Sequence, residues 1–385
     1  MTKVKIPDGW QETKLSKLLT IRNGKDHKNL KDGKYPVLGT GGVIRYVDSY
    51  LYDQPSILIG RKGTIDKPQF ITSPFWTVDT LFYSEISPDV IPFFLFKVVQ
   101  SVNWQQYNQA TGVPSLTATT INNVKVCIPS SKNEQKKIAE ILGTCDRTLE
   151  LTEKLINAKR KLKQALMQKL LTGKLRFPEF EGQKWKVTKS GKVIKFFGGN
   201  AFSSNDSCES GIRWLKIANV GIESVKWDDI SFLPQHYQNQ YKDYLLHDGD
   251  IVMALTRPIL NNRLKICKLS INDVPSLLNQ RVAKISVLNN SINNIYIYFL
   301  LQTRYFINSM NSLLMGNDPP NIGIKDLENI QINFPTNKDE QIKIAECLNS
   351  LEKMIINLEQ QKELLTKQKK GLMQQLLTGK IRVNQ

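Results

Sequence analysis

The sequence predicts an α/β (α+β) protein in which two globular domains with mixed sheets are joined by two long antiparallel coiled-coil helices, as a pseudo-twofold internal repeat. Three observations predict this fold class. The segment Glu134 to Arg176 aligns without a gap on Glu340 to Arg382, with 19 of 43 positions identical. Neither segment contains proline. Each is preceded by a similar short apolar helix and a similar strand ending in proline, so the repeat covers whole structural units.

The length of the chain allows this organisation. Its 385 residues exceed one ordinary domain and suffice for two, each able to bury a core. We expect a first globular domain at 1–130, a first long helix at 131–175, a second globular domain at 176–336 and a second long helix at 337–385.

The ends of both long helices carry recognisable signals. A Ser or Asn stands three residues before a Glu at each start, which is the pattern of a capping box, and a glycine follows each helix where a left-handed residue is needed. These residues are Ser131, Glu134 and Gly173, and Asn337, Glu340 and Gly379. Each helix would span about 40 residues, or roughly 60 Å. Such length needs a packing partner.

An apolar stripe with alternating spacings of four and three follows each helix and is interrupted by lysines near its middle, which predicts a paired coiled coil within the chain. The alternative is that each helix packs only on its own domain. The residues expected to pair the helices are Ile138, Leu142, Leu149, Leu166 and Leu170 in the first copy, and Ile344, Leu348, Leu351, Ile355, Leu372 and Leu376 in the second.

Charge indicates the kind of partner. The chain has 53 Lys and Arg against 35 Asp and Glu, a net charge of +18 and a pI of about 9.5. This excess is spread over all four segments and favours a polyanionic partner. Solvated basic helix faces could supply part of it.

Cysteine usage and hydropathy indicate a cytoplasmic protein. The five cysteines are widely spaced and form no C-x-x-C pair, so we expect reduced thiols and neither disulfides nor a metal site. The longest apolar runs are too short to span a bilayer, and the N-terminus has no apolar signal region.

No catalytic motif stands out. The sequence lacks G-x-x-x-x-G-K-[ST], G-x-G-x-x-G and H-E-x-x-H, and its three histidines are isolated. The stretch "NDPPN" (317–321) is similar to a methyltransferase loop that binds an exocyclic amine, but the aromatic that would stack on the base is missing. We therefore expect no catalytic, cofactor-binding or metal-binding residues, and interpret "NDPPN" as an ordinary turn.

One basic loop in each domain suits DNA. Arginine can bond guanine and asparagine can bond adenine through two hydrogen bonds each, while lysines bind phosphates. The alternative is a solvated hairpin tip. The candidate residues are Arg61, Lys62 and Lys67 around Gly63, and Arg257, Asn261, Asn262, Arg263 and Lys265.

At this point the chain resembles the specificity subunits of type I restriction–modification enzymes over nearly its whole length. The motifs that carry the resemblance are "YPVLGTGGVIRYV" (35–47), "ILIGRKGTI" (57–65), "FWTVDTLFY" (75–83), "WLKIANV" (214–220), "GDIVMALTR" (249–257), "LLNQRVAKIS" (277–286) and the two long helices.

The resemblance implies a non-catalytic subunit with two target-recognition domains, each recognising one half of an asymmetric bipartite site on double-stranded DNA. The helices would set the spacing and dock two methyltransferase subunits, which bring adenine-N6 methylation and S-adenosylmethionine. Motor–nuclease subunits would join the full complex. Thr64 joins the candidate DNA contacts by matching position.

Two other classes compete with this hypothesis. A self-sufficient methyltransferase or nuclease is disfavoured because the cofactor loop is missing. A structural DNA-bridging protein with little sequence preference is disfavoured because its two domains would gain nothing from being dissimilar.

Overall fold

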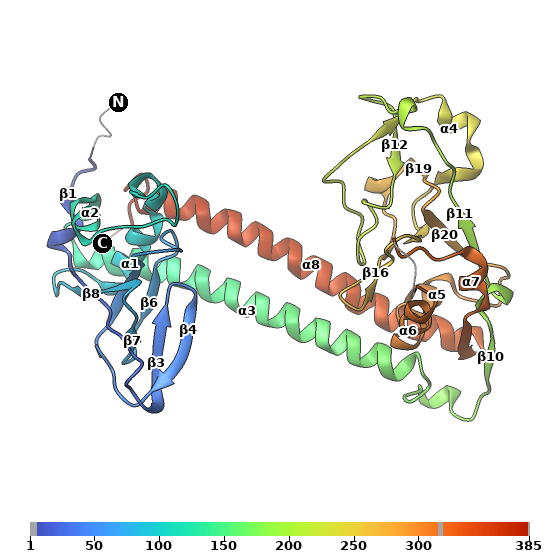
Figure 1. Ribbon diagram of the computed structural model, residues 1–385, viewed down its shortest axis with the longest axis horizontal. Helices are drawn as coiled ribbons and strands as arrows, with labels where there is room; N and C mark the ends of the chain where they lie inside the picture. Colours follow the sequence, from blue (N-terminus) through green and yellow to red (C-terminus); the bar gives the residue numbers. More distant parts are fainter. Residues whose placement is uncertain (1–5, 315–318, 384–385) are drawn as a thin grey trace. The chain divides into compact units, whose positions relative to one another are not determined.

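The computed structural model describes residues 6–314 and 319–383 and divides into two compact units (Figure 1). Unit 1 comprises Met1–Lys154 and Glu359–Gln385, and unit 2 comprises Leu155–Leu358. Each unit therefore combines one globular domain with one end of each long helix.

Within residues 6–154, the domain of unit 1 is built from three small sheets. The first, in the order β2-β8-β5-β6, is antiparallel, and the second, in the order β4-β3-β7, contains one parallel pair, β3 with β7. The third pairs β1 with β9. The strands are β1 (Trp10–Lys14), β2 (Leu19–Arg22), β3 (Asp32–Gly39), β4 (Gly42–Val47), β5 (Ser56–Gly60), β6 (Gln69–Ile71), β7 (Trp76–Thr77), β8 (Leu81–Ile86) and β9 (Lys125–Pro129), and the short helices are α1 (Pro92–Ser101) and α2 (Ala118–Asn123).

In the part of unit 2 that the structure describes, the domain has four sheets. Two are four-stranded, in the orders β11-β20-β15-β18 and β13-β12-β19-β14, and two are pairs, β16 with β17 and β10 with β21. Its strands are β10 (Trp185–Lys189), β11 (Ile194–Gly198), β12 (Ile212–Leu215), β13 (Phe232–Leu233), β14 (Leu245–Leu246), β15 (Ile251–Ala254), β16 (Ile259–Leu260), β17 (Arg263–Leu264), β18 (Ile266–Lys268), β19 (Ser276–Leu278), β20 (Val282–Val287) and β21 (Gln331–Pro335). Its short helices are α4 (Tyr237–Gln240), α5 (Asn294–Leu300), α6 (Arg304–Leu314) and α7 (Ile324–Asn329).

The two units repeat the same framework. In each, the first strand pairs antiparallel with the strand that precedes a long helix, and the registers match: Trp10 lies opposite Pro129, and Trp185 lies opposite Pro335. Parallel and antiparallel pairs occur in both units. The α/β (α+β) class with mixed sheets is confirmed.

The two long helices are α3 (Lys132–Leu170) and α8 (Lys338–Leu376), of 39 residues each. Their ends belong to the domain cores. The core of unit 1 contains Ile138 and Leu142 from α3 together with Leu376 from α8. The core of unit 2 contains Leu170 from α3 together with Ile344 and Leu348 from α8. The ends of each helix therefore pack on a domain as well as near the other helix.

Ion pairs within each unit show that the helix segments are antiparallel. In unit 1, Asp146 bonds Lys369 and the later Glu153 bonds the earlier Lys362. In unit 2, Lys163 bonds Glu352 and the later Arg176 bonds the earlier Glu340. The expected pairing residues are buried or half-buried without exception, with Leu149, Leu166 and Leu372 half-buried and the others buried. Each helix therefore pairs with the other helix and also packs on the domain cores, so it does not pack only on its own domain.

The expected capping boxes do not form. Ser131 Oγ accepts the backbone N–H of Glu134 at 3.4 Å, but the carboxylate of Glu134 binds Arg382 instead of returning to the helix start. At the second helix, Glu340 binds Arg176 in the same way. A charge-assisted bond to arginine outcompetes a neutral backbone N–H, which explains the difference.

The glutamine after each of these glutamates joins the helix to its domain. Gln135 donates to the carbonyl of Pro129 at 3.0 Å and accepts the N–H of Ile91 at 2.9 Å. Gln341 makes the equivalent bonds at 2.9 and 2.8 Å, to Pro335 and from Asn293. The repeated "EQ" pair is thus a structural junction.

The glycines at the helix ends behave as expected. Gly173 and Gly379 have left-handed φ angles of 71° and 68°. Each lies against the tryptophan of the neighbouring strand pair, Trp185 and Trp10 respectively. The repeated phrase "LLTGK-R" therefore ends a helix with a glycine and supplies the arginine that binds the other helix.

All five cysteines are free thiols. Burial raises the pKa of Cys267 to about 12, so it stays a neutral thiol. Among the described residues, no helix is both long and apolar enough to cross a membrane.

Candidate nucleic-acid interface

The basic loop of unit 1 follows directly from a fully buried strand. β5 ends at Gly60, and Arg61 and Lys62 are exposed, while Ile65 returns to the core. Gly63 has a φ of 89°, a left-handed conformation that glycine adopts without strain. Gly63 and Thr64 are half-buried in the loop and Lys67 is exposed beyond it.

Hydrogen bonds fix this loop from two sides. The N–H groups of Arg61 and Lys62 donate to the carbonyl of Thr80 at 2.8 and 3.3 Å. On the other side, Gly63 N donates to Pro114 O at 2.9 Å, and Leu116 N donates to Arg61 O at 3.0 Å. The basic side chains therefore stand on a rigid backbone.

The basic loop of unit 2 is a two-residue hairpin. β16 and β17 are joined by Asn261 and Asn262, whose φ angles of 49° and 57° define the left-handed pair of a type I′ turn. Asparagine tolerates this conformation better than most residues, which explains the "NN" in the sequence. Arg257, Asn261, Asn262 and Arg263 are exposed.

The two loops share one backbone arrangement. Arg257 N donates to Pro320 O at 2.7 Å, as Gly63 N does to Pro114 O, and Ile322 N donates to Leu255 O at 2.9 Å, as Leu116 N does to Arg61 O. Arg257 also has a left-handed φ, of 45°. Arg257 is thus the structural counterpart of Gly63, and Arg61 is the counterpart of the buried Leu255.

The stretch "NDPPN" takes part in this arrangement as a support. Pro320 holds Arg257, and Thr256 Oγ1 donates to Asn321 Oδ1 at 2.7 Å. Asn317 and Asp318 lie outside the described residues. Asn321 forms an antiparallel bridge with Thr256, a contact with the basic loop that was not expected.

The side chains of the basic loops differ in their availability. Arg263 forms an ion pair with Glu223 at 2.7 Å. Lys265 is half-buried, and its Nζ donates to the carbonyl of Ile217 at 3.0 Å. Burial lowers the pKa of Lys265. Lys265 is therefore placed more as a support of the hairpin than as an open contact, whereas Arg61, Lys62, Lys67, Arg257, Asn261 and Asn262 are exposed.

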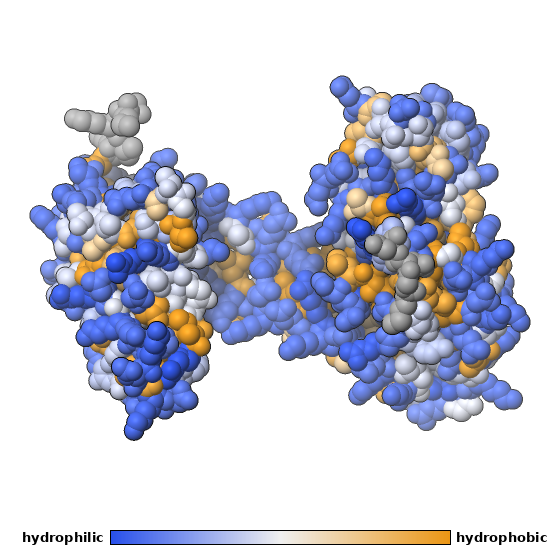
Figure 2. All heavy atoms as spheres, in the orientation of Figure 1, coloured by the Kyte–Doolittle hydropathy of each residue, from blue (hydrophilic) through white to orange (hydrophobic). Residues whose placement is uncertain are grey.

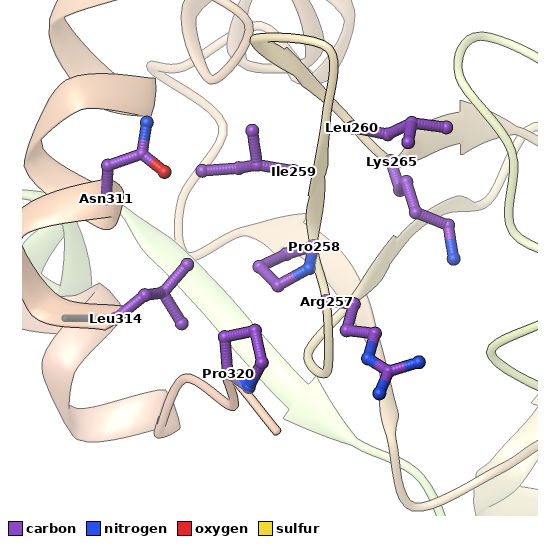
Figure 3. Close-up of a pocket in the computed structure, with 8 residues that line it drawn as sticks. All are labelled: Arg257, Pro258, Ile259, Leu260, Lys265, Asn311, Leu314 and Pro320. Carbon is purple, nitrogen blue, oxygen red and sulfur yellow. The ribbon is translucent and has the colours of Figure 1, made fainter. Parts of the chain in front are cut away.

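A cavity of about 490 Å³ lies beside the unit 2 hairpin (Figure 3). Ile259, Leu314 and Pro320 form an apolar side between the hairpin and α6, and Arg257 extends away from it. Figure 2 shows apolar surface gathered over this part of unit 2. The lining residues are Arg257, Pro258, Ile259, Leu260, Lys265, Asn311, Leu314 and Pro320.

Two of the lysines that interrupt the helix stripe, Lys163 and Lys369, belong to ion clusters with buried members. In unit 1, Asp146 bonds both Lys369 and Lys97 at 2.5 Å, and Lys97 is only 1% exposed. In unit 2, Glu352 bonds Lys163 at 2.8 Å and also Lys268. These clusters satisfy buried charges and favour one helix register.

The pKa values reflect this pairing. Burial alone would raise the pKa values of Asp146 and Glu352, but their lysine partners outweigh it and hold both pKa values below the usual range. Burial lowers the pKa of Lys97 despite the bond to Asp146. Both carboxylates are therefore ionised at neutral pH.

Two groups of residues were missed in the sequence. Asp146 and Glu352 occupy equivalent positions of the repeat, as do Lys163 and Lys369, so the recurrence of an acid and a lysine at the same two positions of both helices was a usable signal. Glu223, which holds Arg263, gave no signal because it lies 40 residues away from its partner in a loop.

Comparison with known proteins defines the class. The family model described as "Type I restriction modification DNA specificity domain" matches residues 7–159 and 182–367. Most of each unit is therefore covered by one copy of the same domain.

Whole proteins of this class are similar over nearly the full length. The chain is 31% identical to the type I restriction enzyme MjaVIII specificity subunit of Methanocaldococcus jannaschii, over 99% of this chain and 95% of the relative. It is 35% identical to the EcoAI specificity subunit of Escherichia coli over a shorter stretch, 37% of this chain and 24% of the relative.

Solved structures show the same fold. The crystal structure of a type I restriction–modification S subunit from M. genitalium superposes with a TM-score of 0.70 at 17% identity, covering 98% of this chain and 97% of the other. The chain belongs to the type I restriction–modification DNA specificity family. It is a specificity subunit, the DNA-recognition component of such an enzyme and not a catalytic one.

Proposed function

We propose that the chain directs a type I restriction–modification enzyme to a bipartite, asymmetric site on double-stranded DNA, with each globular domain recognising one half. The observation that carries this proposal is the pair of basic loops, which share backbone hydrogen bonds at equivalent positions but carry different side chains. A common scaffold with different side chains suits recognition of two different short sequences.

The candidate DNA contacts remain those of the basic loops. The candidates in unit 1 are Arg61, Lys62, Gly63, Thr64 and Lys67. The candidates in unit 2 are Arg257, Asn261, Asn262, Arg263 and Lys265. In the second set we assign Lys265 to supporting the hairpin, since its Nζ is already bound to a backbone carbonyl.

The long helices are proposed to set the gap between the half-sites. At about 1.5 Å per residue, a helix of 39 residues spans about 58 Å, more than one turn of DNA. Deleting one helical turn at matched positions of α3 and α8 should change the spacer and leave both half-sites unchanged. The control is a variant in which the same four residues of each helix are replaced without deletion. A recognised spacer whose length is unchanged by the deletion contradicts the proposal.

The helices are also proposed to dock two methyltransferase subunits, with S-adenosylmethionine bound by those partners, and motor–nuclease subunits would join the full complex. Support comes from large apolar side chains exposed on both helices, including Leu151 and Leu364 in unit 1 and Leu162 and Met354 in unit 2. Exposed apolar residues of this kind favour a protein partner.

The test is co-expression of this chain with the methyltransferase encoded beside it, followed by mapping of N6-methyladenine in the host DNA. We expect methylation at a motif of two unlike halves with a fixed gap. Methylation that is absent or independent of this chain contradicts the proposal. Equal affinity of the chain for any duplex, with a steep salt dependence, favours a DNA-bridging protein instead.

A further inference from the structure

Glu223 links the recognition hairpin of unit 2 to the buried ion cluster of the helices. Arg263 Nη2 donates to Glu223 Oε1 at 2.7 Å, while Glu223 Oε2 lies 3.3 Å from Lys163 Nζ. Lys163 is itself bonded to Glu352 at 2.8 Å and is 5% exposed in its side chain. The carboxylate that holds Arg263 is thus anchored by a lysine that cannot easily move.

The backbone of Glu223 is held in an uncommon conformation. Its φ is 62°, in the left-handed region that costs free energy for a residue with a Cβ. Its N–H donates to the carbonyl of Ile266 at 2.9 Å, which connects this loop to β18 directly after the hairpin. A glycine or asparagine would suit this backbone better, so the sequence keeps a glutamate where local stability disfavours one.

The other end of the pair faces solvent. The side chain of Arg263 is 55% exposed, and its Nη2 is bound by Glu223. A guanidinium has five N–H donors, so binding one of them to Glu223 leaves enough for a bidentate contact. A free arginine loses side-chain entropy when it binds, whereas an arginine already held by a carboxylate loses less.

We propose that Glu223 is a positioning residue that orients Arg263 to recognise a guanine in the half-site of unit 2. The proposal rests on the proposed function, in which unit 2 recognises one half-site. Arginine bonded to O6 and N7 of guanine is the commonest specific contact in the major groove. The negative charge of Glu223 also repels nearby phosphates, so it weakens binding to non-specific DNA while favouring the correct base.

The test uses the complex of this chain with its methyltransferase. Once the site is mapped, binding is measured by fluorescence anisotropy to the cognate duplex, to duplexes with single base-pair changes in the unit 2 half-site, and to an unrelated duplex, at several salt concentrations. Glu223→Gln keeps the size of the side chain and removes its charge. Glu223→Gly removes the carboxylate and relaxes the left-handed backbone, because glycine adopts this conformation without strain. We therefore expect this variant to keep its fold.

We expect both variants to lose about 10-fold in discrimination at one G·C pair of that half-site, with affinity for the unrelated duplex unchanged or higher. Arg263→Ala should lose discrimination at the same base pair. In the double variant of Glu223→Gly and Arg263→Ala the loss should equal that of Arg263→Ala alone, because Glu223 acts through Arg263.

Glu179→Gln is the matched control. It removes the carboxylate of another exposed ion pair of unit 2, with Lys343, and should leave discrimination unchanged. A rise in affinity for all duplexes with unchanged discrimination would show that Glu223 only screens charge and would overturn the proposal. Unchanged binding in both Glu223 variants would overturn it too. If the unaltered complex recognises no bipartite site, the proposed function itself fails.

Discussion

Arg382 and Glu134 form a bidentate ion pair between the end of one repeat and the start of the other repeat's helix. Arg382 Nε and Nη2 donate to the two carboxylate oxygens of Glu134 at 2.7 and 2.9 Å. Arg176 and Glu340 reproduce this geometry in unit 2, at 2.8 and 2.7 Å. The phrase that the sequence repeats thus closes each unit by joining segments more than 160 residues apart.

The first prediction concerns the unequal burial of these two pairs. Both carboxylates are buried, with Glu340 1% and Glu134 2% exposed in their side chains, but Arg176 is only 13% exposed whereas Arg382 is 41% exposed. Arg176→Ala leaves a buried carboxylate without a partner and should lower the free energy of unfolding by about 3 kcal/mol. Arg382→Ala should lower it less, because the Arg382 side chain lies at the surface and its removal lets water enter beside Glu134. Urea unfolding of both variants measures the difference, and equal losses would contradict it.

The second prediction concerns the buried ion cluster of unit 1. Asp146→Ala leaves Lys97 and Lys369 facing each other without a carboxylate, whereas Lys369→Ala leaves Asp146 paired with Lys97. Loss of the shared carboxylate should therefore lower the free energy of unfolding by about 3 kcal/mol or more. Loss of Lys369 should lower it clearly less. Thermal unfolding of the two variants compares them directly. A larger loss for Lys369→Ala would show that Lys97 does not depend on Asp146.

The third prediction concerns stability in acid. The lysine partners hold the pKa values of Asp146 and Glu352 below their ordinary values of 3.8 and 4.5, despite the opposing effect of burial. Because the folded pKa is lower than the unfolded one, the stabilisation is fully present above these ordinary values. It is lost as the pH falls through them toward the folded pKa.

The measurement is the urea midpoint between pH 6 and pH 3. Asp146→Asn and Glu352→Gln should each lower the midpoint at pH 6 and should each flatten its fall below about pH 4.5. A variant whose urea midpoint falls as steeply with pH as that of the unaltered chain would show that the altered carboxylate contributes nothing to the acid dependence.

The fourth prediction compares the two helix-ending glycines. A Cβ at Gly379 would lie 2.7 Å from Pro7 Cγ and 3.0 Å from the Trp10 ring, whereas a Cβ at Gly173 would lie 3.4 Å from Trp185. Both alanine variants incur the cost of a left-handed residue, about 1 kcal/mol. Gly379→Ala should lower the free energy of unfolding more than Gly173→Ala does, because it also forces Pro7 or Trp10 to shift. Differential scanning calorimetry of the pair tests this order, and a larger loss for Gly173→Ala would reverse it.

Much of the architecture follows from local patterns. The long helices, their closing glycines and the repeat are visible in the sequence because helix periodicity, turn residues and identity at a fixed offset are all local signals. The asparagine pair at 261–262 likewise indicates its own turn. The candidate basic loops were identified in the same way, from residue type and neighbouring strands.

The partners of charged residues were not predictable in this way. Lys163 and Lys369 looked like interruptions of a stripe, and Glu134 and Glu340 looked like capping residues, because the groups that bind them come from distant parts of the chain. A single sequence contains no signal that shows which charged residues, distant from one another in the chain, will form ion pairs.

The sequence by itself determined that this protein is a repeat of two α/β domains and two long helices with a basic character suited to DNA. Only the tertiary structure decided that Arg257 is the counterpart of Gly63, that Glu223 holds Arg263, and that each helix serves the cores of both units. The physical reason is range. Backbone propensity and periodicity act between near neighbours, whereas ion pairs and core contacts depend on segments that only folding brings together.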